Sequence, residues 1–239
     1  MSSSARSRTL ATHPDLPVPV DIRPIRNARR LRLRLDERRG VLKLTCPKRT
    51  STRAALAWAA EQKAWVEAQL ERVPAAEPFI PGAVIPVEGE DVRLVWSESE
   101  PRTPKLAVGE LRCGGPESAF GRRIEAFLRK RAAETLSRET AEVAAAAGLT
   151  VRAVSVGDAD TRWGSCSSGG RIRYSWRLIL APPEARRFVV AHEVAHLRHL
   201  NHGPEFKAFE KELYGGVVAG ARALLTRVGP RLKRIGRRH

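Results

Sequence analysis

The chain has 239 residues, of which 42% are hydrophobic and 29% are charged, which is the balance of a globular protein with a sizeable core. Its three cysteines lie far apart without a CxxC pair, which argues against a disulfide framework and a thiolate metal site and favours a reducing cytoplasm. The lack of a long apolar run excludes a membrane-spanning helix. The net charge of +17 is concentrated in residues 23–53 and 227–239, which indicates either contact with nucleic acid or another polyanion, or a merely solubilising surface.

The first part of the chain is predicted to hold a β-hairpin and one helix. Residues 1–17 lack the apolar stretch of a secretory signal and are expected to be a disordered leader. In LRLRLDERRGVLKLTC, leucines alternate with polar residues on both sides of a turn, which predicts a hairpin within residues 18–46 with one apolar and one basic face. Ser51 suits the N-cap of a helix over residues 52–72. The apolar stripe of this helix is expected to pack in the core and comprises Trp58, Trp65, Val66 and Leu70.

Residues 73–116 are rich in proline and glycine and hold short β-like runs. We therefore expect a small β-rich N-terminal domain with one helix over residues 18–116. The helical spacing of apolar residues then predicts a long helix over about residues 117–147, with Gly148 as its stop. The domain boundary is placed at this helix.

The second domain is predicted over residues 117–228, followed by a basic C-terminal tail over residues 229–239. A strand at residues 150–156 precedes a hairpin in TRWGSCSSGGRIRYSWRLIL, whose turn falls at residues 167–170. Another helix begins at the two prolines of LAPPE, because proline is tolerated in a first helical turn. The pattern predicts an α+β fold, in which this helix lies beside a small antiparallel sheet.

This last helix carries the strongest chemical signal of the chain, AHEVAHLRHLNHGPEF, which holds four of the six histidines. His192, Glu193 and His196 form an HExxH motif, and two histidines one helical turn apart lie about 5–6 Å from each other at Cβ, near enough to share one zinc ion. Glu193 lies about 100° round the helix, where it can reach a water molecule at the metal. HExxH also occurs on ordinary amphipathic helices, but the apolar FVVA before it predicts a buried helix, in which unpaired histidines are costly.

A catalytic zinc site needs a third protein ligand. His202 is favoured because the sequence NHGP predicts a chain turn that returns its ring to the metal. Two kinds of alternative stay open: a histidine further along the same helix, and a downstream glutamate. These residues are His199, Glu210 and Glu212.

Two stretches in this order, RWGSCSSGGRIRYSWRLILAPPE and VVAHEVAHLRHLNHGPEF, resemble the YgjP-like metal-dependent hydrolase family, which is related to SprT-like and WLM metallopeptidase domains. The resemblance is close over residues 160–210, and the arginine-rich hairpin with its helix is similar as well. It implies a zincin-like catalytic domain, zinc held by His192, His196 and His202, and Glu193 as the catalytic carboxylate. It also implies peptidase activity, although a UTP pyrophosphatase activity has been proposed within the family.

The hairpin before the HExxH helix offers candidate substrate contacts. If it forms a sheet edge beside the metal, an extended peptide could pair with it, with Arg162, Trp163 and Ser165 as contacts. The alternative is that Trp163 belongs to the core and that Arg162 is a structural ion-pair partner. Cys166 is expected to be a reduced strand cysteine rather than a nucleophile.

Three functions follow from these observations. The first is a zinc-dependent metallopeptidase that cleaves a peptide or protein substrate through a zinc-activated water, with Glu193 as general base. The second is a zinc-dependent nucleotide pyrophosphatase acting on UTP, and the third is a nucleic-acid-associated module with a structural zinc. Manganese or cobalt could replace zinc, and the oligomeric state is left open.

Overall fold

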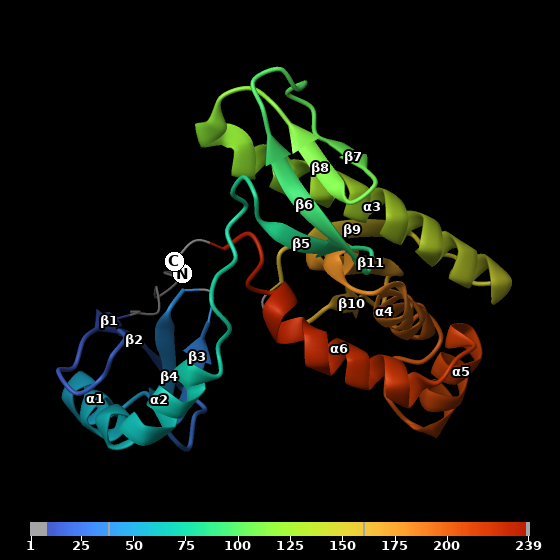
Figure 1. Ribbon diagram of the computed structural model, residues 1–239. Coiled ribbons are helices and arrows are strands. Elements are labelled where there is room, and N and C mark those ends of the chain that lie inside the picture. Colours follow the sequence, from blue (N-terminus) through green and yellow to red (C-terminus); the bar gives the residue numbers. More distant parts are fainter. Residues whose placement is uncertain (1–8, 38, 160, 238–239) are drawn as a thin grey trace, which may run out of the picture. The chain divides into compact units, whose positions relative to one another are not determined.

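The structure is a computed structural model that describes residues 9–37, 39–159 and 161–237 (Figure 1). Within these residues it is an α+β protein with three small sheets and six α-helices. The chain divides into two compact units, Met1–Pro74 and Ala75–His239.

The N-terminal unit is built on a four-stranded sheet with the order β1-β2-β4-β3. Its strands are β1 (Thr9–Ala11), β2 (Val20–Ile25), β3 (Arg32–Asp36) and β4 (Val41–Pro47). The antiparallel pairing of β3 with β4 confirms the predicted hairpin, whereas the parallel pairing of β2 with β4 was not expected. The predicted leader is wrong at Thr9–Ala11, because this segment pairs with β2; residues 1–8 lie outside the described residues.

Two helices pack on one face of this sheet (Figure 1). Ser51 is the predicted N-cap, and its hydroxyl accepts a hydrogen bond from the Ala54 backbone amide at 3.2 Å. The expected single helix is divided at Gln62 into α1 (Thr52–Glu61) and α2 (Lys63–Glu71). Val66 is buried in the core of the unit, but Trp65 is 40% exposed, so the expectation that the whole stripe packs inside is wrong at this tryptophan.

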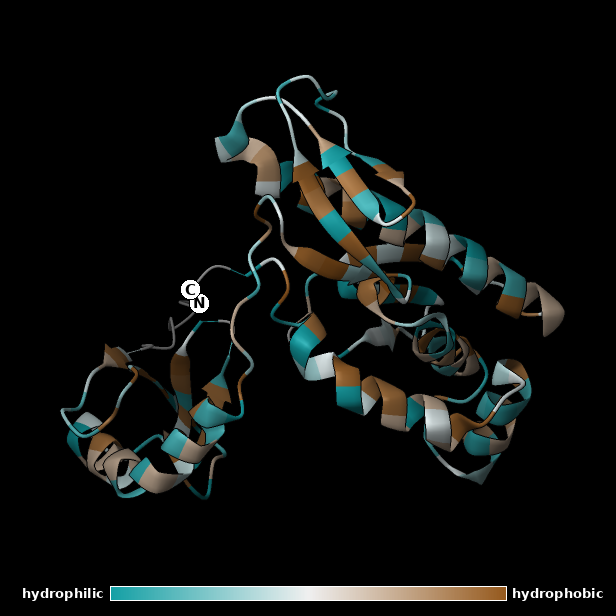
Figure 2. Ribbon diagram, viewed as in Figure 1, coloured by the Kyte–Doolittle hydropathy of each residue, from teal (hydrophilic) through white to brown (hydrophobic). Residues whose placement is uncertain are grey.

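The C-terminal unit begins with a second four-stranded sheet, in the order β5-β6-β8-β7. Its strands are β5 (Val84–Val87), β6 (Glu90–Trp96), β7 (Lys105–Ala107) and β8 (Glu110–Cys113). Apolar and polar residues alternate along β6 and β8 (Figure 2). Leu94 and Leu111 share a core with Phe120 and Ile124 of the following helix, so residues 75–116 belong to this unit and not to the N-terminal domain as predicted.

The predicted long helix is present as α3 (Phe120–Ala146), preceded by a 3-10 turn at Glu117–Ala119. Gly148 follows it with a φ of 64°, the left-handed conformation that a helix stop requires. The predicted strand and hairpin form a sheet with the order β10-β11-β9. Its strands are β9 (Ala153–Gly157), β10 (Gly164–Cys166) and β11 (Arg171–Ser175). The sheet is mixed rather than antiparallel, because β9 and β11 run parallel.

A buried 3-10 segment, Trp176–Leu180, leads from this sheet into three helices. These are α4 (Pro183–Ala195), α5 (Pro204–Tyr214) and α6 (Val218–Leu232). No helix among the described residues is long and apolar enough to cross a membrane.

The segment predicted to be a basic tail is packed into the C-terminal unit. Helix α6 continues to Leu232, and Ile235 is fully buried and bridges to Glu77. Its carbonyl accepts a hydrogen bond at 3.0 Å from the buried Arg177 side chain. The tail prediction is therefore wrong up to residue 237, because an isoleucine in this basic segment contributes to the core; residues 238–239 lie outside the described residues.

Candidate metal centre

Helix α4 carries the HExxH motif along a buried surface. Pro183 occupies its first turn and Glu184 complements the positive helix end. The helix ends at Ala195, so that His196 is the C-cap. The helix ends before the predicted turn in NHGP, yet the rings of His192 and His196 remain neighbours, with centroids 5.0 Å apart.

The chain then turns and brings a third imidazole to the pair. The His202 ring centroid lies 5.1 Å from that of His192 and 4.7 Å from that of His196. One ring nitrogen from each of the three histidines lies within 4.8 Å of the others, an arrangement that could hold a metal ion. His199 faces elsewhere, with its ring nitrogen 3.6 Å from the Glu205 carboxylate and its ring against Phe209.

The donor chemistry of these histidines (the histidine triad) fits a divalent cation. Nδ1 of His192 is hydrogen-bonded to Glu210 at 2.6 Å, and Nδ1 of His196 donates to the His199 carbonyl at 3.1 Å. Both rings therefore keep Nε2 for another partner. The Nε2 atoms of His192 and His202 are 3.3 Å apart, close enough for one ring to donate its N–H to the other or for both lone pairs to face one cation.

Burial also favours the neutral, metal-binding form of two of these rings. It lowers the pKa of His192, although the hydrogen bond to the Glu210 carboxylate opposes the effect. Burial lowers the pKa of His196 as well, although the hydrogen bond to the His199 carbonyl acts to raise it. Three neutral imidazoles are a donor set that suits zinc and other late transition metals.

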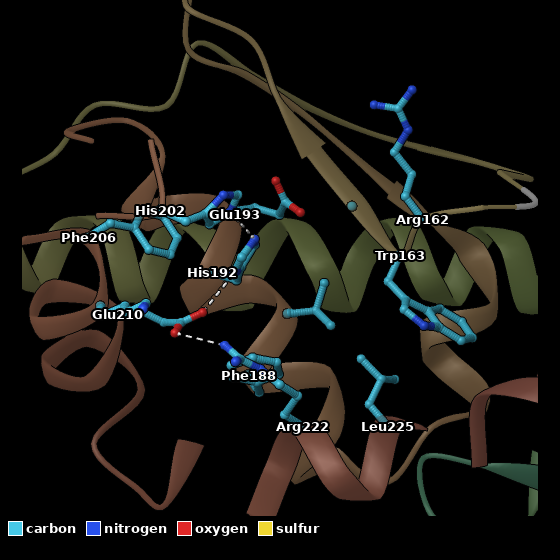
Figure 3. A pocket seen from close by; sticks show the side chains of 13 residues that line it. Arg162, Trp163, Phe188, His192, Glu193, His202, Phe206, Glu210, Arg222 and Leu225 are labelled. Atoms are coloured by element: carbon cyan, nitrogen blue, oxygen red, sulfur yellow. Dashed lines mark hydrogen bonds and ion pairs between the residues drawn. The ribbon is translucent and has the colours of Figure 1, made fainter. Parts of the chain in front are cut away.

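Glu210 holds one of these rings in place. Its carboxylate is 1% exposed and accepts hydrogen bonds from His192 Nδ1 and, at 3.3 Å, from Arg222 (Figure 3). The sequence left Glu210 open as a direct ligand, but here its carboxylate lies behind the imidazole, on the side away from Nε2. Such a carboxylate fixes the tautomer of a metal-binding histidine and raises its basicity.

Replacing Glu210 by alanine is expected to weaken zinc affinity by about 10–100-fold, because the His192 ring loses the group that orients it. Glu210→Gln keeps an oxygen acceptor for Nδ1 and should recover part of the loss. Glu212→Ala removes an exposed carboxylate from the same helix and serves as the matched control. Competition with a zinc chelator measures the affinities; equal values for the Glu210→Ala and Glu212→Ala proteins would contradict the role given to Glu210.

Glu193 lies on the other side of His192, enclosed beneath strand β10 (Figure 3). It is 4% exposed, and its Oε2 atom is buried without a hydrogen-bond partner among the described residues. Burial raises the pKa of Glu193 to about 7, although the positive charge of Arg162 acts to lower it. A Cβ atom at Gly164 would lie 2.4 Å from Glu193 Oε1, so only glycine at this position leaves the carboxylate where it is.

A cavity of about 430 Å³ opens beside His192, Glu193 and His202. Phe188, Val189 and Leu225 give it an apolar wall (Figure 3). Its basic lining residues are Arg162, Lys207 and Arg222. This combination of apolar walls and a few polar groups is typical of small-molecule and peptide sites.

The predicted substrate contacts fall in different places. Arg162 is exposed and lines the cavity, whereas Ser165 lies on β10 outside the described lining. Trp163 lines the cavity and also packs against the hydrophobic core. Its ring lies so close to helix α6 that a Cβ atom at Gly229 would be 3.1 Å from it. Burial, and secondly the charge of Glu193, raises the pKa of the Cys166 thiol, which is the opposite of what a nucleophile needs.

Strand β10 is partly exposed. It is the outer strand of its sheet, with β11 as its neighbour. Trp163 accepts a hydrogen bond from Ser175 at 2.8 Å, and Ser167 donates one to Arg171 at 2.9 Å. Because backbone groups alternate in direction along a strand, the N–H and C=O groups of residues 164 and 166 point away from β11. These groups take no part in the pairing of β10 with β11.

Two contributions to the site were not anticipated from the sequence. Phe206, at the start of α5, packs against all three histidine rings, with centroids 4.6–5.1 Å away. Arg222, on α6, binds the carboxylate that holds His192. The spacing of Phe206, Phe209 and Glu210 on one helical face was a usable signal for a helix packed on the histidines.

Comparison with known protein families gives one match. The family model described as "YgjP-like, metallopeptidase domain" matches residues 29–226, a span that contains the histidine triad, Glu193 and Glu210. The searches of curated proteins and of solved structures returned no match.

Proposed function

The chain belongs to the YgjP-like metallopeptidase family, and from this premise we propose that it hydrolyses peptide bonds with a zinc ion held by His192, His196 and His202. A metallopeptidase domain implies a metal ion, and the observation that carries the proposal is the convergence of three imidazole nitrogens within 4.8 Å. The His192 ring is oriented by the hydrogen bond between its Nδ1 atom and Glu210, and histidine ligands of metal sites are commonly oriented by such a carboxylate.

Glu193 is proposed as the general base. When bound, the cation supplies Lewis acidity, which acidifies a water molecule and polarises the scissile carbonyl. The Glu193 carboxylate receives the proton of that water and passes it to the departing amine nitrogen. Its enclosure beneath Gly164 keeps it in one position and limits its contact with bulk water.

The substrate is proposed to bind as an added strand along β10. The outward backbone groups of residues 164 and 166 would pair with an extended peptide, and the apolar wall of the cavity would receive one of its side chains. Arg162 lies at the cavity as a candidate contact to a carbonyl or an acidic group of the peptide. Main-chain pairing of this kind supports a protease that tolerates many sequences.

A nucleotide pyrophosphatase is the second candidate. The observation in its favour is the basic part of the cavity lining, Arg162, Lys207 and Arg222, because such side chains hold phosphate groups. Arg222 already interacts with Glu210. The outer edge of β10 has no role in nucleotide binding, and we therefore place this candidate second.

One purified sample separates the two. After its metal content is measured, casein cleavage and UTP hydrolysis are followed in the native protein, after dialysis against a chelator, and after zinc is restored. We expect casein cleavage that is lost on chelation and regained with zinc, and no chelator-sensitive UTP hydrolysis. Zinc-dependent UTP hydrolysis without casein cleavage would contradict the peptidase proposal and support the nucleotide pyrophosphatase.

A further inference from the structure

The sheet of the N-terminal unit has two unlike faces. Residues of one parity, such as Ile22, Leu42 and Leu44, are buried against α1 and α2. Residues of the other parity face away from the helices and include four cations and two acids. The cations of this face, here called the basic sheet face, are Arg23, Arg32, Arg34 and Lys43.

The acidic residues on this face are buried and already paired. Asp21 accepts from Arg23 and Arg39, each at 3.1 Å, and Asp36 pairs with Lys43. Arg32 and Arg34 are exposed and form no ion pair among the described residues. The same holds for cations in the adjoining loops, namely Arg26, Arg29, Arg30, Lys48 and Arg49. The face therefore keeps an uncompensated positive charge.

The C-terminal unit uses many of its arginines differently. Several lie in ion pairs with glutamate or aspartate, so that their charge is neutralised locally. Examples are Arg129, Arg131, Arg138 and Arg186. A surface that only keeps a protein soluble can carry charges of both signs. The excess of positive charge on the N-terminal unit therefore indicates a negatively charged partner outside the chain.

An exposed tryptophan lies at the edge of the same sheet. Trp65 of α2 is 40% exposed and lies in a hollow of about 270 Å³ beside the edge strand β3. Arg34 of the basic sheet face and Arg72 also line this hollow, together with one acid, Glu37. A large aromatic ring that stays exposed in a hollow shared with two arginines is suited to stacking with a planar, anionic ligand.

We propose that the N-terminal unit binds single-stranded nucleic acid. A base stacks on Trp65, Arg34 and Arg72 hold the phosphates next to it, and the strand continues over Arg32 on the basic sheet face. A single strand is favoured over a duplex because its bases are free to leave one another and stack on a side chain. The proposal is independent of the metal site, since none of these residues belongs to the C-terminal unit.

The test uses the full chain and a fluorescein-labelled 20-nucleotide oligothymidylate, with binding followed by anisotropy between 50 and 300 mM salt. Trp65→Ala is expected to weaken binding about 5-fold or more without changing the salt dependence, because stacking is lost and no charge is removed. Trp65→Phe should retain most of the affinity. Arg32→Ala/Arg34→Ala is expected to reduce the slope of log K against log salt by about 1.4, or about 0.7 for each lost phosphate contact.

Arg122→Ala/Arg152→Ala is the matched control, because it removes two exposed arginines from the C-terminal unit. Its affinity should stay within about 2-fold of the parent chain. Circular dichroism checks that each variant is folded. The proposal is overturned if the parent chain does not bind at 50 mM salt, if the control loses as much affinity as Arg32→Ala/Arg34→Ala, or if a folded Trp65→Ala variant binds as the parent does.

Discussion

Replacing Glu193 by glutamine is expected to lower kcat for peptide hydrolysis by about 10²–10⁴-fold, with zinc content unchanged. The amide has nearly the same size as the carboxylate but cannot accept a proton from water. Zinc should remain because the three converging imidazoles do not include this residue. The measurement is kcat on a fluorogenic peptide or on casein, with zinc determined on the same sample.

The matched control for this variant is Glu184→Gln, which changes an exposed glutamate in the first turn of the same helix. Its kcat should equal that of the parent chain. Because Glu193 is buried, circular dichroism must show that both variants are folded. A folded, zinc-loaded Glu193→Gln protein that keeps more than about a tenth of the parent kcat would rule out Glu193 as the general base.

The second large effect is expected on zinc binding itself. His192→Ala, His196→Ala and His202→Ala should each lose more zinc affinity than the roughly 10–100-fold expected for an orienting residue such as Glu210, because each removes a ligand. Zinc content after gel filtration and affinity by chelator competition provide the measurement. Peptide hydrolysis should fall in parallel in all three variants.

His199→Ala is the control for this series, because His199 lies on the same stretch but faces Glu205 and Phe209. It should retain one zinc ion per chain. A His202→Ala protein with full zinc content would mean that another group completes the site. The series therefore decides between His202 and His199, and the Glu210→Ala and Glu212→Ala proteins test the two glutamates that the sequence left open.

The parts of the fold that depend on local sequence signals were predictable. The alternation in residues 31–46, the cap at Ser51 and the stop at Gly148 each act within a few residues, and the structure confirms all three. The parallel pairing of β2 with β4 and the strand at Thr9–Ala11 depend on contacts between distant segments. Alternation reveals a strand but does not identify its neighbour, so these pairings could not be predicted.

The unit boundary and the C-terminal segment show the same limit. Strands β5–β8 read as a continuation of the first β layer, yet their apolar face packs on α3. The last basic residues were predicted to be a tail, because composition outweighed the two buried side chains of Leu232 and Ile235. Two buried residues among charged neighbours are too few to give a periodic pattern.

In the candidate site, the helical part was predictable and its supports were not. The motif placed His192 and His196 on one turn, and the turn residues around His202 suggested its return; the three rings do lie together, while metal binding stays a prediction. Glu210, Arg222 and Phe206 come from other helices. The spacing of Phe206 and Glu210 marked a helical face suited to packing, but it did not identify Arg222 as a partner of that face. Trp65 is a further case, since helical spacing marked it as a core residue and the structure leaves it exposed.

The packing of the C-terminal segment makes the cavity dependent on residues that follow the histidines in the chain. Trp163 rests on Gly229, Leu225 forms part of the cavity wall, and Arg177 binds the carbonyl of Ile235. Removing residues 225–237 would leave all three histidines in the chain but would take away Leu225 of the cavity wall, the support of Trp163 and the partner of Arg177. The intact site therefore depends on a segment that contributes no residue to the histidine triad.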